Sequence, residues 1–75
     1  MQQSKTLGQN VRRRRQKLGI SQEELALRSG LNRTYVTDVE LGKYNVTLLT
    51  ICKLAGALEC RPSELLRGVS PVDSK

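Results

Sequence analysis

The stretch Gln22–Leu41, QEELALRSGLNRTYVTDVEL, predicts two short helices that meet at a sharp turn. Ser21 is a favourable N-cap for the first helix, and Glu24, three residues further on, completes a capping-box pattern. Gly30 stands where a left-handed C-cap would end that helix, and Asn32 is placed to cap the second helix. Two helices joined by three or four residues that include a glycine form the helix-turn-helix pattern.

The small and apolar residues of this stretch indicate how its two helices pack. Ala26 is small enough to let the second helix cross close to the first. The angle between the helices is filled by apolar residues, namely Leu25, Leu31, Val36 and Val39. The opposite face of the second helix carries the candidates for reading the edges of DNA bases, which are Arg33, Thr34, Thr37 and Asp38. We therefore expect this unit to bind DNA, although helical hairpins without that function exist.

Size and charge limit the remaining possibilities. The chain has 75 residues, enough for one small domain, and burial of only about 60% of its surface makes a single core marginal. The formal net charge of +6 favours a polyanionic partner, although a merely soluble basic surface would show the same balance. No apolar run is long enough to span a membrane, and the N-terminus lacks the apolar core of a signal peptide. We therefore expect a cytoplasmic protein.

Metal and enzyme chemistry are not expected from these residues. Cys52 and Cys60 have no CxxC spacing and the chain has no histidine, so a common zinc site cannot be assembled. Both cysteines should be free and packed as small hydrophobic residues. Since no nucleophile stands beside a base and no glycine-rich phosphate loop is present, we expect no enzyme activity, no cofactor and no small-molecule ligand.

The helical signals along the chain predict a compact all-α domain of five helices. The first helix is expected from about Thr6 to Leu18, and the second and third are the two helices of the central unit. The fourth is expected from about 48 to 58, after the cap Thr47, and the fifth over about Pro62–Leu66. Residues 1–5 are expected to be a flexible N-terminus, residues 6–67 the folded domain and residues 68–75 a flexible tail.

Two charged residues fall on helix faces that are otherwise apolar. Arg15 shares the apolar face of the first helix, and Glu40 shares that of the third. Because an unpaired buried charge is costly, we expect the two to pair, which would place the first helix across the end of the third. The alternative is that both charges reach the edge of the core and stay solvated. The other arginines of the run Arg12–Arg15 more simply form a solvated face.

The helix that reads LLTICKLAGAL is apolar almost all round, with only Thr50 and Lys53 polar. Such a helix must be covered on more than one side, and the rest of the chain is too small to cover it. A homodimer is the simplest remedy. The candidate interface residues are Ile51, Cys52, Leu54 and Leu66. Gly56 would permit close approach of a neighbour, or it only accommodates packing within one chain.

The segment from about Thr6 to Leu66 resembles the phage-repressor and Cro-like (XRE-type) helix-turn-helix family, a five-helix all-α domain. The residues that carry this resemblance are LGISQEELA and SGLNRTYVTDVELG. In that family an arginine of the first helix pairs with a glutamate at the end of the third, which also implies the pair of Arg15 with Glu40. The run LNRTYVTDVE, followed by Asn45-Val46-Thr47, looks most like restriction–modification controller proteins. These are small dimers that bind palindromic operators and time the expression of an endonuclease and of their own gene.

This resemblance implies roles for particular residues. Arg33 and Thr34 correspond to base-reading positions, and Tyr35 and Asn45 to contacts with the DNA backbone. The sequence departs from the pattern at Tyr44, where an arginine is common, and at Leu41, which replaces a polar residue.

The chemistry of the side chains agrees with these roles. Arg33 can bind guanine O6 and N7 in a bidentate way, and Thr34 can touch a thymine methyl group or a base acceptor. Thr37 can reach a phosphate or a base, whereas Asp38 would accept from cytosine N4 or orient Arg33. The candidates for contacts with the DNA backbone are Gln22, Asn32, Tyr35, Lys43, Tyr44 and Asn45. Each has the alternative of being a plain surface residue.

The function expected from the sequence is sequence-specific binding of double-stranded DNA by a homodimer that regulates transcription from a palindromic operator. An antitoxin-like protein-interaction module that also binds DNA is the alternative. Such chains often add a disordered segment that wraps the partner, and only seven residues follow Gly68 here.

Overall fold

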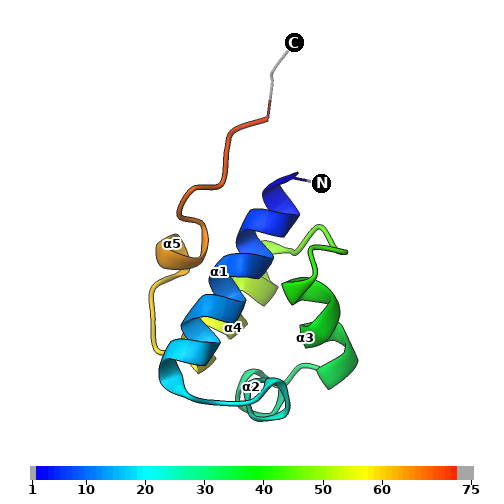
Figure 1. Cartoon of the computed structure of the whole chain (residues 1–75), viewed down its shortest axis with the longest axis vertical. Coiled ribbons are helices and arrows are strands. Elements are labelled where there is room, and N and C mark those ends of the chain that lie inside the picture. The colour runs from blue at the N-terminus through cyan, green and yellow to red at the C-terminus, as the bar shows by residue number, and fades with distance from the viewer. Residues whose placement is uncertain (1, 73–75) are drawn as a thin grey trace.

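The computed structural model describes residues 2–72, which form five α-helices and no strand (Figure 1). These helices are α1 (Gln2–Leu18), α2 (Gln22–Ser29), α3 (Arg33–Glu40), α4 (Leu48–Ala57) and α5 (Pro62–Leu65). The all-α, five-helix prediction is confirmed. Within this part of the chain, no helix has the length and apolar character needed to cross a membrane.

The predicted N-caps of α2, α3 and α4 act as expected, although the capping box of α2 is only half formed because the Glu24 carboxylate pairs with Arg28. The side chains of Ser21, Asn32 and Thr47 each accept a hydrogen bond from a backbone N–H group of the helix that follows. Gly30 adopts a left-handed conformation with φ 73°, which lets the chain turn from α2 into α3. These local choices fix the helix-turn-helix before any tertiary contact is considered.

The prediction for the start of α1 is wrong. The helix begins at Gln2, and residues 2–5, which we expected to form a flexible segment, are its first turn. Thr6 does not cap the helix, because its hydroxyl donates to the carbonyl of Gln2 at 3.2 Å. Tertiary packing explains the extension, since Ser4 is buried and the backbone of Lys5 lies against Gly42. Residue 1 lies outside the described residues.

The core lies where α1, α2, α3, α4 and α5 converge. The largest fully buried side chains are Leu25, Leu54, Leu58, Leu65, Val11, Val36 and Val39. α1 packs against α3 on one side and against α5 on the other, while α4 packs against α2 and α5. As a result α3 buries one face against α1 and α2 and leaves its other face open.

α1 and α3 approach one another at backbone distance. A Cβ atom added at Gly8 would come within 2.7 Å of the carbonyl oxygen of Glu40 and would also collide with that of Val39. Gly8 is therefore required by the crossing of two helices rather than by a turn. The crossing places Gly8 over the last turn of α3, and Arg15, about two helical turns further along α1, reaches Glu40 as expected.

The C-terminal part of the described chain folds back on α1. α5 is one turn long, and the Glu64 carboxylate accepts a hydrogen bond from the backbone N–H of Arg61 at 3.0 Å. This hydrogen bond holds the pKa of Glu64 below its ordinary value. The side chain of Gln3 donates to the carbonyl of Ser70 at 3.3 Å, so the segment after Gly68, expected to be a tail, runs beside the start of α1. Residues 73–75 lie outside the described residues.

Candidate nucleic-acid interface

The open face of α3 carries the predicted base-reading residues. Val36, Val39 and Glu40 point inward because they recur at helical spacing. Arg33 and Thr34, in the first turn, are exposed, whereas Thr37 and Asp38 are partly buried. The structure thus leaves two of the four candidates free and engages the other two in contacts within the chain.

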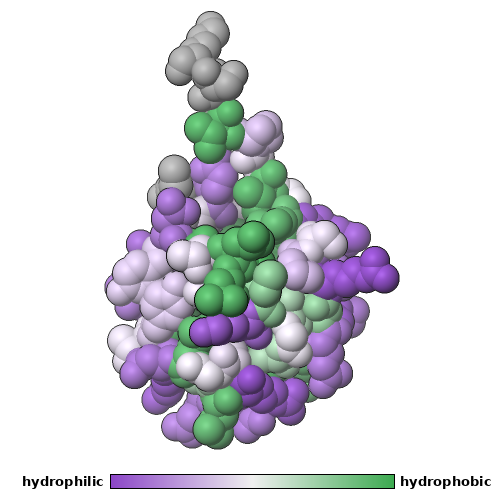
Figure 2. All heavy atoms as spheres, turned by 180° about the vertical axis from the view of Figure 1, so that it is seen from behind, coloured by the Kyte–Doolittle hydropathy of each residue, from purple (hydrophilic) through white to green (hydrophobic). Residues whose placement is uncertain are grey.

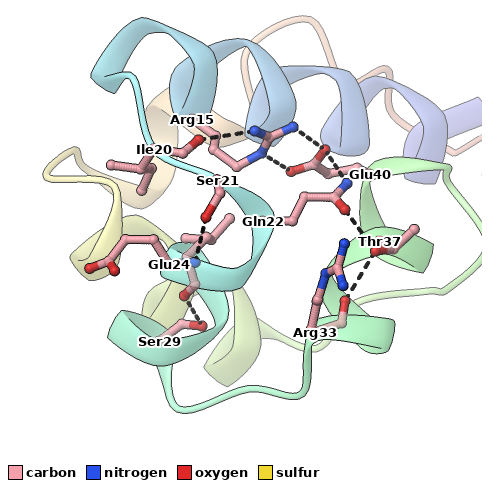
Figure 3. Close-up of polar contacts among 10 residues, drawn as sticks. Arg15, Ile20, Ser21, Gln22, Glu24, Ser29, Arg33, Thr37 and Glu40 are labelled. Carbon is pink, nitrogen blue, oxygen red and sulfur yellow. Dashed lines mark hydrogen bonds and ion pairs between the residues drawn. The ribbon is translucent and has the colours of Figure 1, made fainter.

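Arg15 and Glu40 form the predicted ion pair, which Figure 3 shows between α1 and α3. Arg15 Nε donates to Glu40 Oε2 at 2.7 Å and Arg15 Nη2 donates to Glu40 Oε1 at 3.0 Å, so the pair is bidentate. Arg15 Nη1 also donates to the carbonyl of Ile20 at 3.0 Å. The hydrogen bond to Glu40 raises the pKa of Arg15 above its ordinary value, which keeps the guanidinium charged.

The ion pair continues into a hydrogen-bonded chain that reaches the open face of α3 (Figure 3). Gln22 Nε2 donates to Glu40 Oε1 at 3.1 Å, and Gln22 Oε1 accepts from Thr37 Oγ1 at 2.9 Å. The Thr37 hydroxyl also lies 3.1 Å from the carbonyl oxygen of Arg33. Gln22 therefore ties the start of α2 to α3, while its second amide hydrogen stays available for a phosphate.

Asp38, for which we expected either a contact with cytosine or a role in orienting Arg33, pairs with neither arginine nor threonine of the reading face but with Lys43. Its carboxylate lies 3.6 Å from Lys43 Nζ. The reason is the turn after α3, where Gly42 has φ 77° and the N–H of Lys43 donates to the carbonyl of Asp38 at 3.0 Å. Lys43 remains largely exposed, and an exposed pair of this kind is weak enough to be exchanged for a phosphate.

Tyr35 and Tyr44 stack on one another, with ring centroids 5.1 Å apart and an angle of 25° between the rings. They are the only aromatic residues of the chain. The stack holds the loop after α3 against the helix, beside exposed Asn45. The sequence predicts two separate tyrosine contacts with DNA. The stacking of the rings could not be predicted, because a separation of nine residues across a glycine turn does not show that they meet.

The N-termini of α2 and α3 border an open hollow of about 450 Å³. The residues that line it are Arg15, Ser21, Gln22, Glu23 and Arg33. Two helix N-termini and Arg33, which forms no ion pair within residues 2–72, favour an anionic group such as a phosphate at this hollow. Arg15, by contrast, is already paired with Glu40, and Glu23 adds a negative charge. In the described part of the chain, no group of three or more His, Cys, Asp or Glu side chains is placed to hold a metal ion.

The residues predicted for a dimer contact are only partly available. Leu54 and Ile51 are buried in the core of their own chain, so their side chains are not available for a contact with a second copy. The apolar side chains that α4 leaves exposed are instead Leu48 (71%) and Leu49 (65%). Figure 2 shows hydrophobic residues gathered over the upper and middle part of the side of the molecule where α4 lies, with a hydrophilic side chain crossing below them.

The other two candidates for that contact are accessible. Cys52 is exposed on α4, and Leu66 is 38% exposed after α5. Both cysteines are free, as predicted, although only Cys60 packs against the core. Burial raises the pKa of the Cys60 thiol above its ordinary value, which favours the uncharged form.

A compact five-helix fold whose third helix presents an exposed arginine and threonine from a helix-turn-helix defines a DNA-binding domain. The helix-turn-helix family model matches residues 11–65, and the chain belongs to this family. It is a DNA-binding transcription regulator, and the resemblance noted in the sequence is confirmed.

Named relatives place the chain near restriction–modification controllers. It is 47% identical over 60 residues to the control protein C.BamHI of Bacillus amyloliquefaciens, covering 79% of this chain and 74% of that protein. It is 38% identical over 73 residues to an uncharacterised helix-turn-helix regulator, y4dJ, of Sinorhizobium fredii, covering 97% and 91%. The crystal structure of the controller protein C.AhdI from Aeromonas hydrophila superposes with a TM-score of 0.84 at 48% identity, covering 87% of this chain and 98% of that one.

Proposed function

We propose that this protein is a homodimeric regulator that reads a two-fold symmetric operator and controls a restriction–modification system. The observation that carries the proposal is the presence, on one small chain, of an open reading helix and a separate exposed apolar surface. α3 supplies the first, and Leu48, Leu49, Cys52 and Leu66 supply the second, which we name the α4 surface.

The α4 surface supports self-association for a physical reason. A chain of 75 residues can build only a small core. Exposing Leu48 and Leu49 to water, at 71% and 65%, is unfavourable, and burying them in a contact with a second copy would lower the free energy. A contact of one copy with a second copy through the same patch is closed and two-fold symmetric. Two copies of α3 would then enter successive major grooves about one turn, roughly 34 Å, apart.

Within each half-site we assign base reading to Arg33 and Thr34. Arg33 begins α3, is exposed and has no carboxylate within 4.0 Å among residues 2–72, so its guanidinium group can bind a guanine. Thr37 and Asp38 take lesser parts, because Gln22 and Lys43 already engage them. The contacts proposed for the DNA backbone are those of Gln22, Asn32, Tyr35, Lys43, Tyr44 and Asn45.

The test is selection of duplexes from a random-sequence library by the full chain. We expect a two-fold symmetric motif whose half-sites are centred about one helical turn apart. A single asymmetric motif would contradict the dimeric arrangement, and the absence of any enriched sequence would contradict sequence-specific reading.

The controller role has its own test. Similarity to C.BamHI and C.AhdI supports it, and it requires a methyltransferase or endonuclease gene beside the gene for this protein. A reporter fused to the promoter of that neighbour should change its output when the protein is supplied. A neighbourhood without either gene would contradict the controller role and leave the reading of DNA intact.

A further inference from the structure

A second basic surface lies on α1, away from α3. A groove of about 200 Å³ runs between α1 and α5, which we name the α1–α5 groove. Its polar lining consists of Asn10, Arg13, Arg14, Lys17, Glu64 and Arg67. Because α1 packs against α3 on one side and α5 on the other, the groove and the reading helix lie on opposite flanks of α1 (Figure 1).

The groove is held together by hydrogen bonds from α1 to the turns around α5. The Asn10 amide donates to the carbonyls of Leu65 at 2.8 Å and of Arg67 at 2.7 Å. Arg14 donates to the carbonyls of Leu58 at 3.3 Å and of Glu59 at 3.1 Å. The walls are therefore ordered before any ligand arrives.

The cations of the groove outnumber its anions. In the described part of the chain, no carboxylate lies within 4.0 Å of Arg13, Lys17 or Arg67. The single carboxylate of the lining, Glu64, lies 4.0 Å from Arg14 and accepts a hydrogen bond from the backbone of Arg61. The groove thus carries a local excess of positive charge: Arg14 holds its walls together, whereas Arg13, Lys17 and Arg67 form no ion pair in the described part of the chain.

Two features argue against a nucleic acid as the occupant. A duplex that receives α3 in its major groove lies on the other flank of α1. Single strands bind surfaces that combine basic residues with stacked aromatic rings, and both tyrosines of this chain lie at α3 and its following loop. What remains suitable is a short anionic segment with carboxylate side chains.

We propose that the α1–α5 groove binds an acidic segment of a second protein while α3 is on DNA. Arg13 donates from Nη1 to the Asn10 side chain at 3.4 Å but has no carboxylate partner in the described part of the chain, and Arg67 has none there either, so each guanidinium group can take a carboxylate. Lys17 adds a third cation. Because the groove opens on the flank away from α3, a partner held there does not compete with the duplex. This inference does not depend on dimer formation or on the controller role.

The first experiment measures fluorescence anisotropy of a labelled peptide of about ten residues with alternating Asp and Leu, and of its Asn counterpart, added to the full chain. We expect the acidic peptide to bind at least about tenfold more tightly than the Asn peptide. The double variant Arg13→Gln/Lys17→Gln, which we call the groove variant, should lower the affinity for the acidic peptide by about fivefold or more. Equal binding of the two peptides would overturn the proposal.

The matched control is Arg12→Gln/Lys53→Gln, which removes the same charge from exposed positions outside the groove. This control variant should lower the affinity for the acidic peptide by less than about twofold at ordinary salt. Arg67→Gln, on the exposed turn after α5, should also lower the affinity for the acidic peptide, and it does so without altering α1. Equal losses in the groove and control variants would show that net charge alone attracts the peptide, and this would overturn the proposal.

The second experiment adds a random-sequence duplex of about 30 base pairs. The peptide should bind protein already saturated with this duplex as well as it binds free protein. The groove variant should lose no more duplex affinity than the control variant. Displacement of the peptide by the duplex, or a selective loss of duplex binding in the groove variant, would make the groove a nucleic-acid surface and overturn the proposal.

Discussion

Arg15 makes three hydrogen bonds, two to Glu40 and one to the carbonyl of Ile20, so one side chain joins α1, α3 and the turn before α2. The pair could be predicted because each charge fell on an otherwise apolar helix face. The part taken by Gln22 could not be predicted. An amide at the start of a helix can bond to a phosphate, to solvent or to a neighbour, and only the observed approach of α2 to α3 selects Glu40 and Thr37.

Removing one partner of this buried pair should be costly. Glu40→Ala should lower the free energy of unfolding by about 3 kcal/mol, because it leaves the guanidinium of Arg15, which is only 13% exposed, without its counter-ion. In a double-mutant cycle measured by urea denaturation, adding Arg15→Ala should recover part of this loss.

The exposed pair Arg28 with Glu24 provides the comparison, and its coupling should stay below about 1 kcal/mol. Additive effects of Arg15→Ala and Glu40→Ala would show that the ion pair does not join α1 to α3.

At the scale of the helices, the number of helices and most of their ends could be predicted from the sequence, because capping residues act locally. The start of α1 was missed because its first turn is wholly polar in sequence, and packing of Ser4 in the core decides it. The close crossing of α1 and α3 at Gly8 could not be seen either, because a glycine inside a helical pattern looks the same whether its missing side chain is needed or not.

Two glycine substitutions test this crossing. Gly8→Ala should destabilise the fold by about 1–3 kcal/mol, since the added methyl meets the backbone carbonyls at the end of α3. Gly56→Ala, in the last turn of α4 with open space around the new Cβ, should instead stabilise by up to about 0.5–1 kcal/mol. Thermal unfolding followed by circular dichroism measures both. A neutral Gly8→Ala would mean that the two helices do not touch there.

At the scale of the whole molecule, the DNA-binding role could be predicted from the helix-turn-helix, whereas the dimer surface could not be placed correctly. An apolar helix such as α4 does not reveal which leucines its own chain will cover. Only the packing of the other helices around α4 decides that Ile51 and Leu54 are buried and that Leu48 and Leu49 remain outside. The α4 surface is therefore a proposal made from the structure.

Charges introduced on the α4 surface should prevent self-association. Sedimentation of the wild-type chain at micromolar concentration should show a species of twice 8.4 kDa, and Leu48→Glu/Leu49→Glu should show the 8.4 kDa monomer. Leu27→Glu is the control, because Leu27 is exposed to 74% on α2 and outside this surface. A monomeric wild type, or equal loss of the dimer in both variants, would contradict the proposed interface.

The sequence-specific binding proposed for this protein depends most directly on Arg33 of α3 reading a base. The decisive measurement is a set of binding titrations, at several salt concentrations, on the duplex selected from the random library and on a scrambled duplex. Arg33→Ala should lose about 1–3 kcal/mol per half-site on the selected duplex and relax the preference at one base position, with little change on the scrambled one. Lys43→Ala should weaken both duplexes alike and reduce the salt slope by about one unit per contact. Equal weakening of both duplexes by Arg33→Ala would contradict base reading by Arg33 and make it a phosphate contact.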